Sequence, residues 1–233
     1  MTIGLNSAGC GKWIVICLMG SALAGCASKD RAASTGNDST VEARKDFEIT
    51  KDPPFTAQTH FAAGQLAESQ NNPASAIDQY ERAIKLEPKH SASLYRLGIV
   101  YAQLKRYNEA VAVWKQYVNV TDASATAFSN LGFCCELAGR NDEAETAYRQ
   151  GITKDPRNGP CRVNYGLMLA RHGHVDQAVI QLQVVLTPSQ VHYNVASVLE
   201  GQGLKEQAKY EFQKAIELNP SSGDARTRMA GLN

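Results

Sequence analysis

The chain has 233 residues, of which 43% are hydrophobic and 20% are charged, an ordinary composition for a protein with a buried core. Its 24 basic and 23 acidic residues leave a formal net charge of +1. This balance gives no electrostatic reason to expect nucleic acid or an anionic membrane surface as the main partner, so we set both classes of function aside.

Residues 1–25 have the pattern of a signal peptide. Lys12 precedes an apolar run from Trp13 to Met19, which continues through small residues to Leu23. The apolar stretch of about a dozen residues is too short for a membrane span, which takes ~20 residues. Its length suits the apolar core of an export signal, and the sequence therefore predicts a segment that is removed rather than part of the fold.

The four residues Leu23 to Cys26 resemble the lipobox of bacterial lipoproteins. The resemblance implies cleavage after Gly25 and acylation of Cys26, with enough acyl chains for stable anchoring in a membrane. An ordinary secretory signal and a chance match in an apolar stretch remain the alternatives. Ala27 and Ser28 follow, and neither is the aspartate that marks inner-membrane retention in many lipoproteins. The expected location is the cell envelope, and the outer membrane facing the periplasm is favoured if the organism has two membranes.

We predict that residues 26–56 form a lipidated N-terminus followed by a flexible tether. Small and polar residues dominate Ala27 to Thr40, without an apolar periodicity that would order them. Pro53 and Pro54 stiffen the entry to the folded part. A flexible stretch of ~30 residues spans roughly 30 Å, enough to hold a domain clear of lipid headgroups.

A small residue recurs at a fixed period from residue 64 onward. Four glycines lie thirty-four residues apart, and an alanine follows each of them twelve residues later. Glycine inside a helical pattern costs about 1 kcal/mol relative to alanine, so a recurring glycine needs a packing reason. We infer that the small residues let the two helices of a hairpin cross closely. The positions are Gly64, Gly98, Gly132 and Gly166, with Ala76, Ala110, Ala144 and Ala178.

Large apolar residues surround these small positions, and prolines end three of the second helices. Burying each large side chain contributes ~1.5–3 kcal/mol, which outweighs the cost of the glycine. Proline cannot donate the hydrogen bond that would continue a helix. The large residues include Tyr80, Leu94, Leu97, Tyr101, Trp114, Phe128, Leu131 and Tyr148, and the prolines are Pro88, Pro156 and Pro220.

These positions resemble the tetratricopeptide repeat, a thirty-four-residue helix-turn-helix unit with spaced Trp, Leu-Gly, Tyr, Ala, Phe, Ala and Pro. The resemblance covers nearly all of residues 57–233 and recurs in register. It implies an all-α fold, an α-solenoid of about five repeats, closed by a C-terminal capping helix whose polar residues cover the open end. The expected units are residues 57–90, 91–124, 125–158, 159–188 and 189–222, with the cap at 223–233.

The fourth unit departs from the pattern. Pro188 arrives two residues early, and the next small residue, Ala196, follows Gly166 by only thirty residues. Four missing residues amount to about one helical turn, roughly 6 Å of rise. We predict that the second helix of this unit ends near Leu186 and that the superhelix changes its twist between the fourth and fifth units.

The resemblance also implies that the first helix of each pair lines the concave surface, where a peptide or helix of a protein partner would bind. Candidates on these helices are not needed for the hairpin core, and they combine aromatic and Arg side chains with amides, which suit a peptide backbone. The predicted partner-binding residues are Tyr95, Arg96, Ile99, Asn130, Phe133, Asn164, Leu167, Arg171, Tyr193 and Asn194, with Phe61 and Gln65 as further candidates.

Alternative roles for these residues remain open. The asparagines could equally bond one helix to another, because this position often does so in the repeat. Tyr95 and Tyr193 could be half-buried walls of the groove. Arg96 and Arg171 are isolated from the lysines of the basic clamp by which some family members hold carboxylate-ended chaperone tails, so that role is disfavoured.

The remaining candidates for chemistry do not form a site. Cys134 and Cys161 lie where a disulfide could form, although small buried residues are the favoured interpretation. His172 and His174 flank a glycine in a turn, without a third metal ligand. Carboxylates such as Glu143 and Glu145 are expected on exposed helix faces, where their charge keeps the protein soluble. The sequence thus predicts no metal, no cofactor, no small-molecule substrate and no enzymatic activity.

These observations lead to one hypothesis with one main alternative. The hypothesis is a scaffold anchored in the bacterial cell envelope through Cys26, which binds a protein partner in the concave groove. Similar lipoproteins help to assemble pili and secretion complexes, or bring cell-wall enzymes together. The alternative is a soluble or secreted regulatory subunit that modulates an enzyme and has no lipid anchor.

Overall fold

The computed structural model of the chain describes residues 55–232, so the predicted signal peptide, Cys26 and nearly all of the tether lie outside the described residues. Within residues 55–232 the chain forms eleven α-helices and no strand. The helices are α1 (Ala57–Ser69), α2 (Pro73–Leu86), α3 (Ser91–Gln103), α4 (Tyr107–Val120), α5 (Ala125–Leu137), α6 (Asn141–Lys154), α7 (Gly159–Arg171), α8 (Val175–Leu182), α9 (Pro188–Gly201), α10 (Lys205–Leu218) and α11 (Gly223–Ala230).

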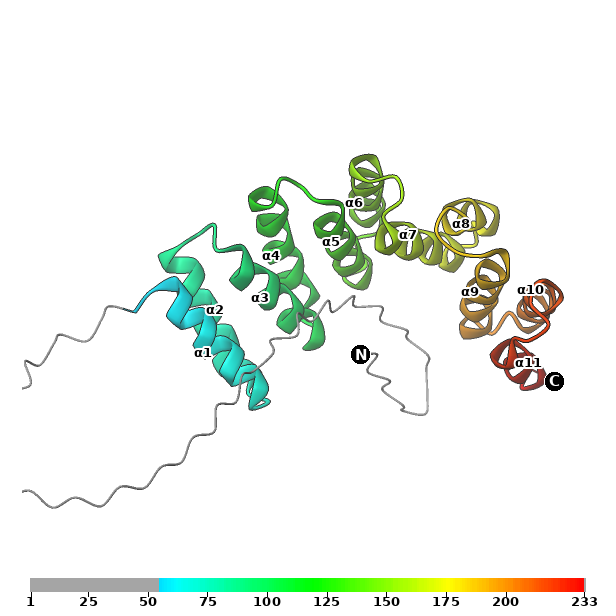
Figure 1. The fold of residues 1–233 in the computed structure, drawn as a ribbon, viewed down its shortest axis with the longest axis horizontal. Helices are drawn as coiled ribbons and strands as arrows, with labels where there is room; N and C mark the ends of the chain where they lie inside the picture. Colours follow the sequence, from blue (N-terminus) through cyan, green and yellow to red (C-terminus); the bar gives the residue numbers. More distant parts are fainter. Residues whose placement is uncertain (1–54, 233) are drawn as a thin grey trace, which may run out of the picture. The chain divides into compact units, whose positions relative to one another are not determined.

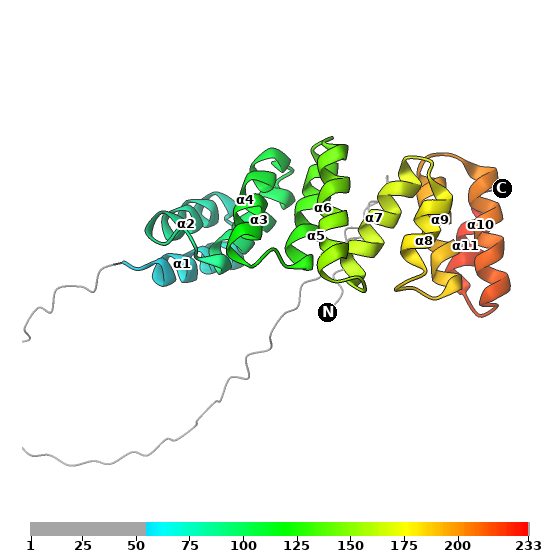
Figure 2. The ribbon, with the colours of Figure 1, turned by 90° about the horizontal axis from the view of Figure 1, so that it is seen from above.

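The helices pack as five consecutive pairs followed by a single helix. Each pair is a hairpin such as α1 with α2, and each second helix also contacts the first helix of the next pair, as α2 contacts α3. Figures 1 and 2 show the pairs stacked in chain order, and in Figure 1 the first helices lie on one side and the second helices on the other. We call these sides the first-helix face (α1, α3, α5, α7 and α9) and the second-helix face (α2, α4, α6, α8 and α10). The prediction of an α-solenoid of about five repeats with a capping helix is confirmed.

The recurring glycines make room for a large side chain on the second helix of the same pair. A Cβ atom placed on Gly98 would lie 2.7 Å from Cε2 of Trp114, and one on Gly132 would lie 2.7 Å from Cε1 of Tyr148. Real Cβ contacts are essentially never that short, so any other residue would push the two helices apart. The alanines that follow the four glycines are fully buried. The predicted close crossing of the two helices is therefore present, and in the first three units the nearest neighbour of the glycine is a ring.

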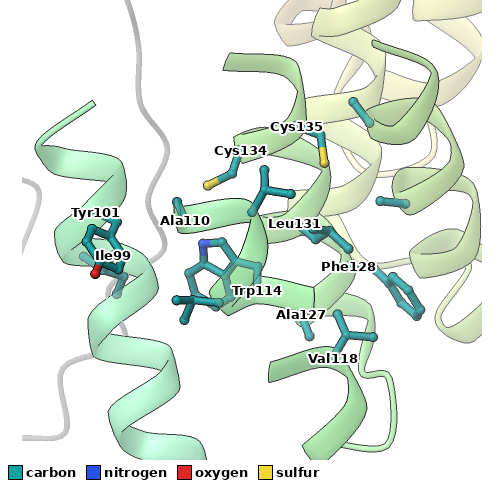
Figure 3. Close-up of a cluster of buried hydrophobic side chains, with 14 of the residues drawn as sticks. Ile99, Tyr101, Ala110, Trp114, Val118, Ala127, Phe128, Leu131, Cys134 and Cys135 are labelled. Atoms are coloured by element: carbon teal, nitrogen blue, oxygen red, sulfur yellow. The ribbon is translucent and has the colours of Figure 1, made fainter. Parts of the chain in front are cut away.

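Trp114 shows how one unit connects to the next. Its indole is 2% exposed, and Figure 3 shows it facing α5, where Ala127, Leu131 and Cys134 lie. The ring of Tyr95 meets the indole edge-on, with centroids 5.5 Å apart. Because the same side chain fills the space inside its own pair and covers the next pair, the second and third units share one core.

The turns inside the pairs use a left-handed residue seven positions after the recurring small residue. Gly139, Gly173 and Gly203 have φ values of 75°, 81° and 75°, and Lys105 takes the same place in the second unit with a φ of 60°. A left-handed residue ends a helix and lets the chain reverse, and glycine adopts it without a steric cost. His172 and His174, which flank Gly173, are exposed on this turn, as predicted.

The fourth unit is shorter than predicted. α8 has 8 residues where α6 has 14, and it ends at Leu182 rather than near Leu186. The backbone amides of Val185 and Leu186 both donate to the Leu182 carbonyl, so the chain closes in a tight turn before Pro188 begins α9. Proline favours the first position of a helix, so α9 begins at Pro188. The segment between Leu182 and Pro188 is then too short for another turn of α8.

The buried side chains also divide at this unit. One hydrophobic cluster extends through the first units as far as Ala178, and a second cluster begins at Leu182 and continues to Leu232. Leu182 takes the place opposite Gly166 that a ring occupies in the earlier units. The predicted change in superhelical twist stays a prediction.

The three cysteines of the described chain are free and buried. The Cys161 thiol donates to the carbonyl of Ala125 at 3.1 Å and thereby joins α7 to α5. Burial raises the pKa of the Cys161 thiol to about 11 and that of Cys134 to about 12. The interpretation of these cysteines as small residues packed between helices is confirmed.

Candidate partner-binding surface

Two of the predicted partner-binding residues on the first-helix face are arginines, and both form ion pairs with a neighbouring first helix. Arg96 forms a two-pronged ion pair with Glu68 of the preceding unit, with Nε donating to Oε1 at 2.9 Å. Arg171 pairs with Glu136 of the preceding unit, but its Nε and a terminal nitrogen both contact the single oxygen Oε1, at 2.7 and 2.6 Å. Each arginine is thus held by a carboxylate on the neighbouring first helix, and its role in binding a partner stays a prediction.

An ion pair of the same kind joins the last helix of the array to the fifth unit. Arg228 on α11 pairs with Glu200 on α9, and it also donates to the hydroxyl oxygen of Ser197 at 2.5 Å. Its guanidinium lies over the rings of Tyr193 and Phe212, at 5.5 and 5.3 Å from their centroids. The three pairs involve the acidic residue four positions after the small residue of the first, third and fifth units. That spacing is a signal present in the sequence, and sequence reasoning missed it.

A tyrosine hydroxyl completes the first of these ion pairs. The Tyr80 hydroxyl donates to Glu68, whose side chain is 15% exposed, and burial together with this hydrogen bond raises the pKa of Tyr80. The carboxylate therefore receives hydrogen bonds from its own pair and from the next one. We infer that this arrangement fixes the orientation of the first two units relative to each other.

Two of the predicted aromatic residues pack against other rings of the array and expose only part of their surface. Tyr95 is half-buried between the rings of Trp114 and Tyr117, and Tyr193 is half-buried against Phe212. Ile99 is 4% exposed and belongs to the hydrophobic core, so it presents almost no surface to a partner. Phe133 is half-buried, and none of the ring pairs between described residues includes it.

The three asparagines have different surroundings although they occupy equivalent positions. Asn164 donates to the Ser129 hydroxyl at 3.2 Å and joins α7 to α5, while Asn194 donates to the backbone carbonyl of Gln190 at 2.8 Å. Asn130 makes no side-chain hydrogen bond to any described residue. Asn164 therefore bonds one helix to another, which was one of the two interpretations of these asparagines. The side-chain amide of Asn130 bonds to no described residue.

Four predicted residues on the first helices of the second, third and fourth units are neither fully buried nor held in an ion pair. Tyr95 on α3, Asn130 and Phe133 on α5, and Leu167 on α7 are all half-buried and uncharged. We call this set the central patch. Because α5 and α7 contact each other, Asn130, Phe133 and Leu167 lie on adjacent helices. The central patch offers apolar area and an amide with both donors and an acceptor.

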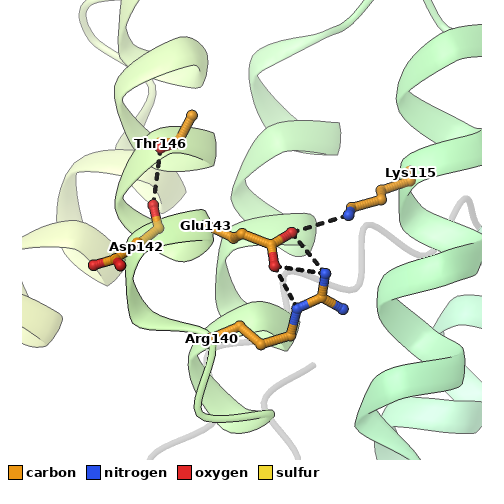
Figure 4. Close-up of polar contacts among 5 residues, drawn as sticks. All are labelled: Lys115, Arg140, Asp142, Glu143 and Thr146. Carbon is orange, nitrogen blue, oxygen red and sulfur yellow. Dashed lines mark hydrogen bonds and ion pairs between the residues drawn. The ribbon is translucent and has the colours of Figure 1, made fainter.

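The second-helix face carries ion pairs between and within units. Glu143 accepts from Lys115 of the preceding unit and from Arg140, as Figure 4 shows, and these bonds lower the pKa of Glu143. Glu145 accepts from the Tyr165 hydroxyl of the next unit at 2.9 Å, and from Arg149. Both carboxylates are exposed, as predicted, and they also join neighbouring units through these contacts.

Two searches of residues 55–232 bear on other functions. No group of three His, Cys, Asp or Glu side chains in this part of the chain is placed to hold a metal ion. None of the described helices has the length and hydropathy needed to cross a membrane.

Known proteins match this chain by sequence. Three family models of the tetratricopeptide repeat match it, over residues 61–127, 127–160 and 189–222. Small glutamine-rich tetratricopeptide repeat-containing protein 2 of Mycosarcoma maydis is 30% identical over 97 residues, which make up 42% of this chain and 28% of the relative. Human tetratricopeptide repeat protein 7B is 30% identical over 93 residues, 40% of this chain and 11% of the relative. The chain spans less than a third of the length of these relatives.

Solved structures share the fold at low identity. The crystal structure of MamA superposes with a TM-score of 0.60 at 22% identity, covering 72% of this chain and 94% of that one. The crystal structure of YrrB, described as a TPR protein with an unusual peptide-binding site, has a TM-score of 0.56 at 21% identity, covering 75% of this chain and 92% of that one.

Proposed function

Because the chain belongs to the tetratricopeptide repeat family, we propose that it is a non-enzymatic scaffold that holds a segment of a protein partner on the central patch of its first-helix face. Proteins with these repeats bind protein partners. The observation that supports this site is the state of two half-buried side chains: Asn130 makes no side-chain hydrogen bond to a described residue, and Phe133 takes part in no ring pair between described residues. Aromatic side chains in such positions are frequent hot spots of interfaces.

The chemistry of the patch defines the partner segment. The nearby arginines of the first-helix face, Arg96 and Arg171, are neutralised by Glu68 and Glu136. An acidic tail would find neither of these two cations free, so the segment that fits carries apolar side chains and presents backbone groups to Asn130. Binding of this kind depends weakly on ionic strength, because screening acts mainly on charges.

A charge placed in the central patch should weaken binding. Asn130→Asp keeps the shape of the side chain but exchanges the amide donors for a carboxylate, and we expect roughly tenfold weaker binding of the partner that co-purifies with the wild-type chain. Asn119→Asp, the same change at an exposed position of α4, is the matched control. The melting temperature should stay unchanged in both variants. Equal losses in the two variants would contradict the proposed surface.

We further propose that the array is anchored in the cell envelope through a lipidated Cys26, and that it serves the assembly of a pilus, secretion or cell-wall complex. The supporting feature is the resemblance of Leu23 to Cys26 to a lipobox. The alternative is a soluble or secreted subunit that regulates an enzyme through the same surface.

Metabolic labelling separates the anchored form from the soluble one. Cells that express the full chain are grown with a fatty acid that carries a detectable tag, and the chain should carry label that is lost in Cys26→Ser. A wild-type chain without label, or label retained in the variant, would decide for the soluble alternative.

A further inference from the structure

The shortened fourth unit borders a groove whose lining includes none of the residues of the central patch. The groove has a volume of about 520 Å³, and the helices that form it are α6, α7 and α8. Ile152, Leu169 and Ile180 supply apolar lining, and Arg149 and Arg162 supply guanidinium groups. Figure 2 shows α7 between α6 and α8. A space of this size holds several side chains of a peptide.

Arg162 stands where other units have a different kind of residue. It lies four positions before the small residue of its unit, where the second and third units have the buried Leu94 and Phe128. Its Nε donates to the carbonyl of Pro156 at 2.9 Å, and its terminal nitrogen donates to the side-chain carbonyl of Gln181. These bonds hold the guanidinium in place with neutral acceptors only.

In the fifth unit a carboxylate lies at the place of Gln181. His192 is equivalent to Arg162 there, and its Nδ1 lies 2.6 Å from a carboxylate oxygen of Glu211. The fourth unit supplies the amide of Gln181 in place of that carboxylate, and Arg162 takes part in none of the ion pairs of residues 55–232. Arg149 is paired with Glu145 at 2.7 Å, so the uncompensated charge of the groove comes from Arg162.

Apolar area lies next to this charge. Ile180 is 54% exposed, whereas the equivalent positions of the first three units are Asp78, Ala112 and Thr146. A large apolar side chain in place of small or polar ones leaves hydrophobic surface open to water, which is a common mark of an interaction site.

We propose that this groove binds a protein segment that places a carboxylate side chain against Arg162 and an adjacent apolar side chain against Ile152 and Ile180. A fixed guanidinium fork is suited to a carboxylate, and a charge-assisted bond at a partly buried site contributes more than an exposed ion pair. The site is separate from the central patch, so its failure in an experiment leaves the proposed function standing.

A peptide selection tests the proposal on the full chain. A random peptide library is selected on immobilised wild-type protein, and the affinity of each enriched peptide is then measured with variants. We expect the enriched peptides to combine Asp or Glu with a neighbouring apolar residue. Arg162→Gln should weaken their binding roughly tenfold or more, Arg162→Lys should have a smaller effect, and Arg226→Gln, at an exposed position of α11, should have none.

A second variant covers the case in which Arg162→Gln unfolds the protein. Ile180→Asp changes an exposed side chain, adds a negative charge to the groove and should abolish binding of the acidic peptides, while Ala112→Asp at the equivalent position of α4 should leave it intact. The proposal is overturned if no peptide is enriched, if the enriched peptides lack acidic residues, or if Ile180→Asp binds them as tightly as Ala112→Asp does.

Discussion

The variant Gly98→Ala is expected to lower the free energy of unfolding by about 1–3 kcal/mol, although alanine is the better helix former. The added Cβ would lie 2.7 Å from Cε2 and 2.9 Å from Cζ2 of Trp114. That ring is buried against the next unit, so it cannot move without disturbing α5. Urea unfolding followed by circular dichroism measures the loss.

The same substitution at Gly201 is the control. Gly201 is the last residue of α9, and nothing lies within 4 Å of the position of its added Cβ. Gly201→Ala should leave stability unchanged or raise it by up to ~1 kcal/mol. If the two variants have equal stability, the recurring glycines do not set the distance between the helices, and the packing described for the units is incorrect.

The second large effect concerns the ion pair between the first two units. Arg96→Met leaves the carboxylate of Glu68, which is 15% exposed, without its cation, and we expect a loss of about 1–3 kcal/mol. Arg82→Met removes an arginine from an exposed pair with Asp78, where the side chains are 58% and 50% exposed, and should cost less than ~0.5 kcal/mol.

A double variant separates the pair from the packing of each side chain. Arg96→Met combined with Glu68→Met should cost less than the sum of the two single changes, because neither charge is then left alone. Strict additivity would show that the two side chains act independently and that Glu68 does not hold Arg96.

Several parts of this structure follow from the sequence because they depend on a repeated requirement. A glycine that recurs at a fixed spacing with an alanine and a ring can be explained only by two helices that cross closely, and repetition separates this pattern from chance. The prolines likewise predict helix ends, since α2 and α6 stop two residues before Pro88 and Pro156.

Other parts depend on geometry that no periodicity contains. Ile99 follows Gly98 directly and was expected on the surface, yet the packing of neighbouring pairs buries it. The early end of α8 depends on the competition between its last turn and the start of α9 at Pro188. Arg96 looked isolated because its partner, Glu68, lies twenty-eight residues away on another helix. Long-range pairs of this kind become visible only when the units are stacked.

The most direct test of the partner-binding surface is site-specific crosslinking in cells. The photoreactive residue p-benzoylphenylalanine, a close relative of phenylalanine, replaces Phe133 in the central patch in one variant and the exposed Gln116 of α4 in another. We predict that ultraviolet light links a protein partner to the Phe133 position, and that Asn130→Asp in the same chain reduces the yield. Crosslinks formed from the Gln116 position alone would contradict a binding surface on the first-helix face.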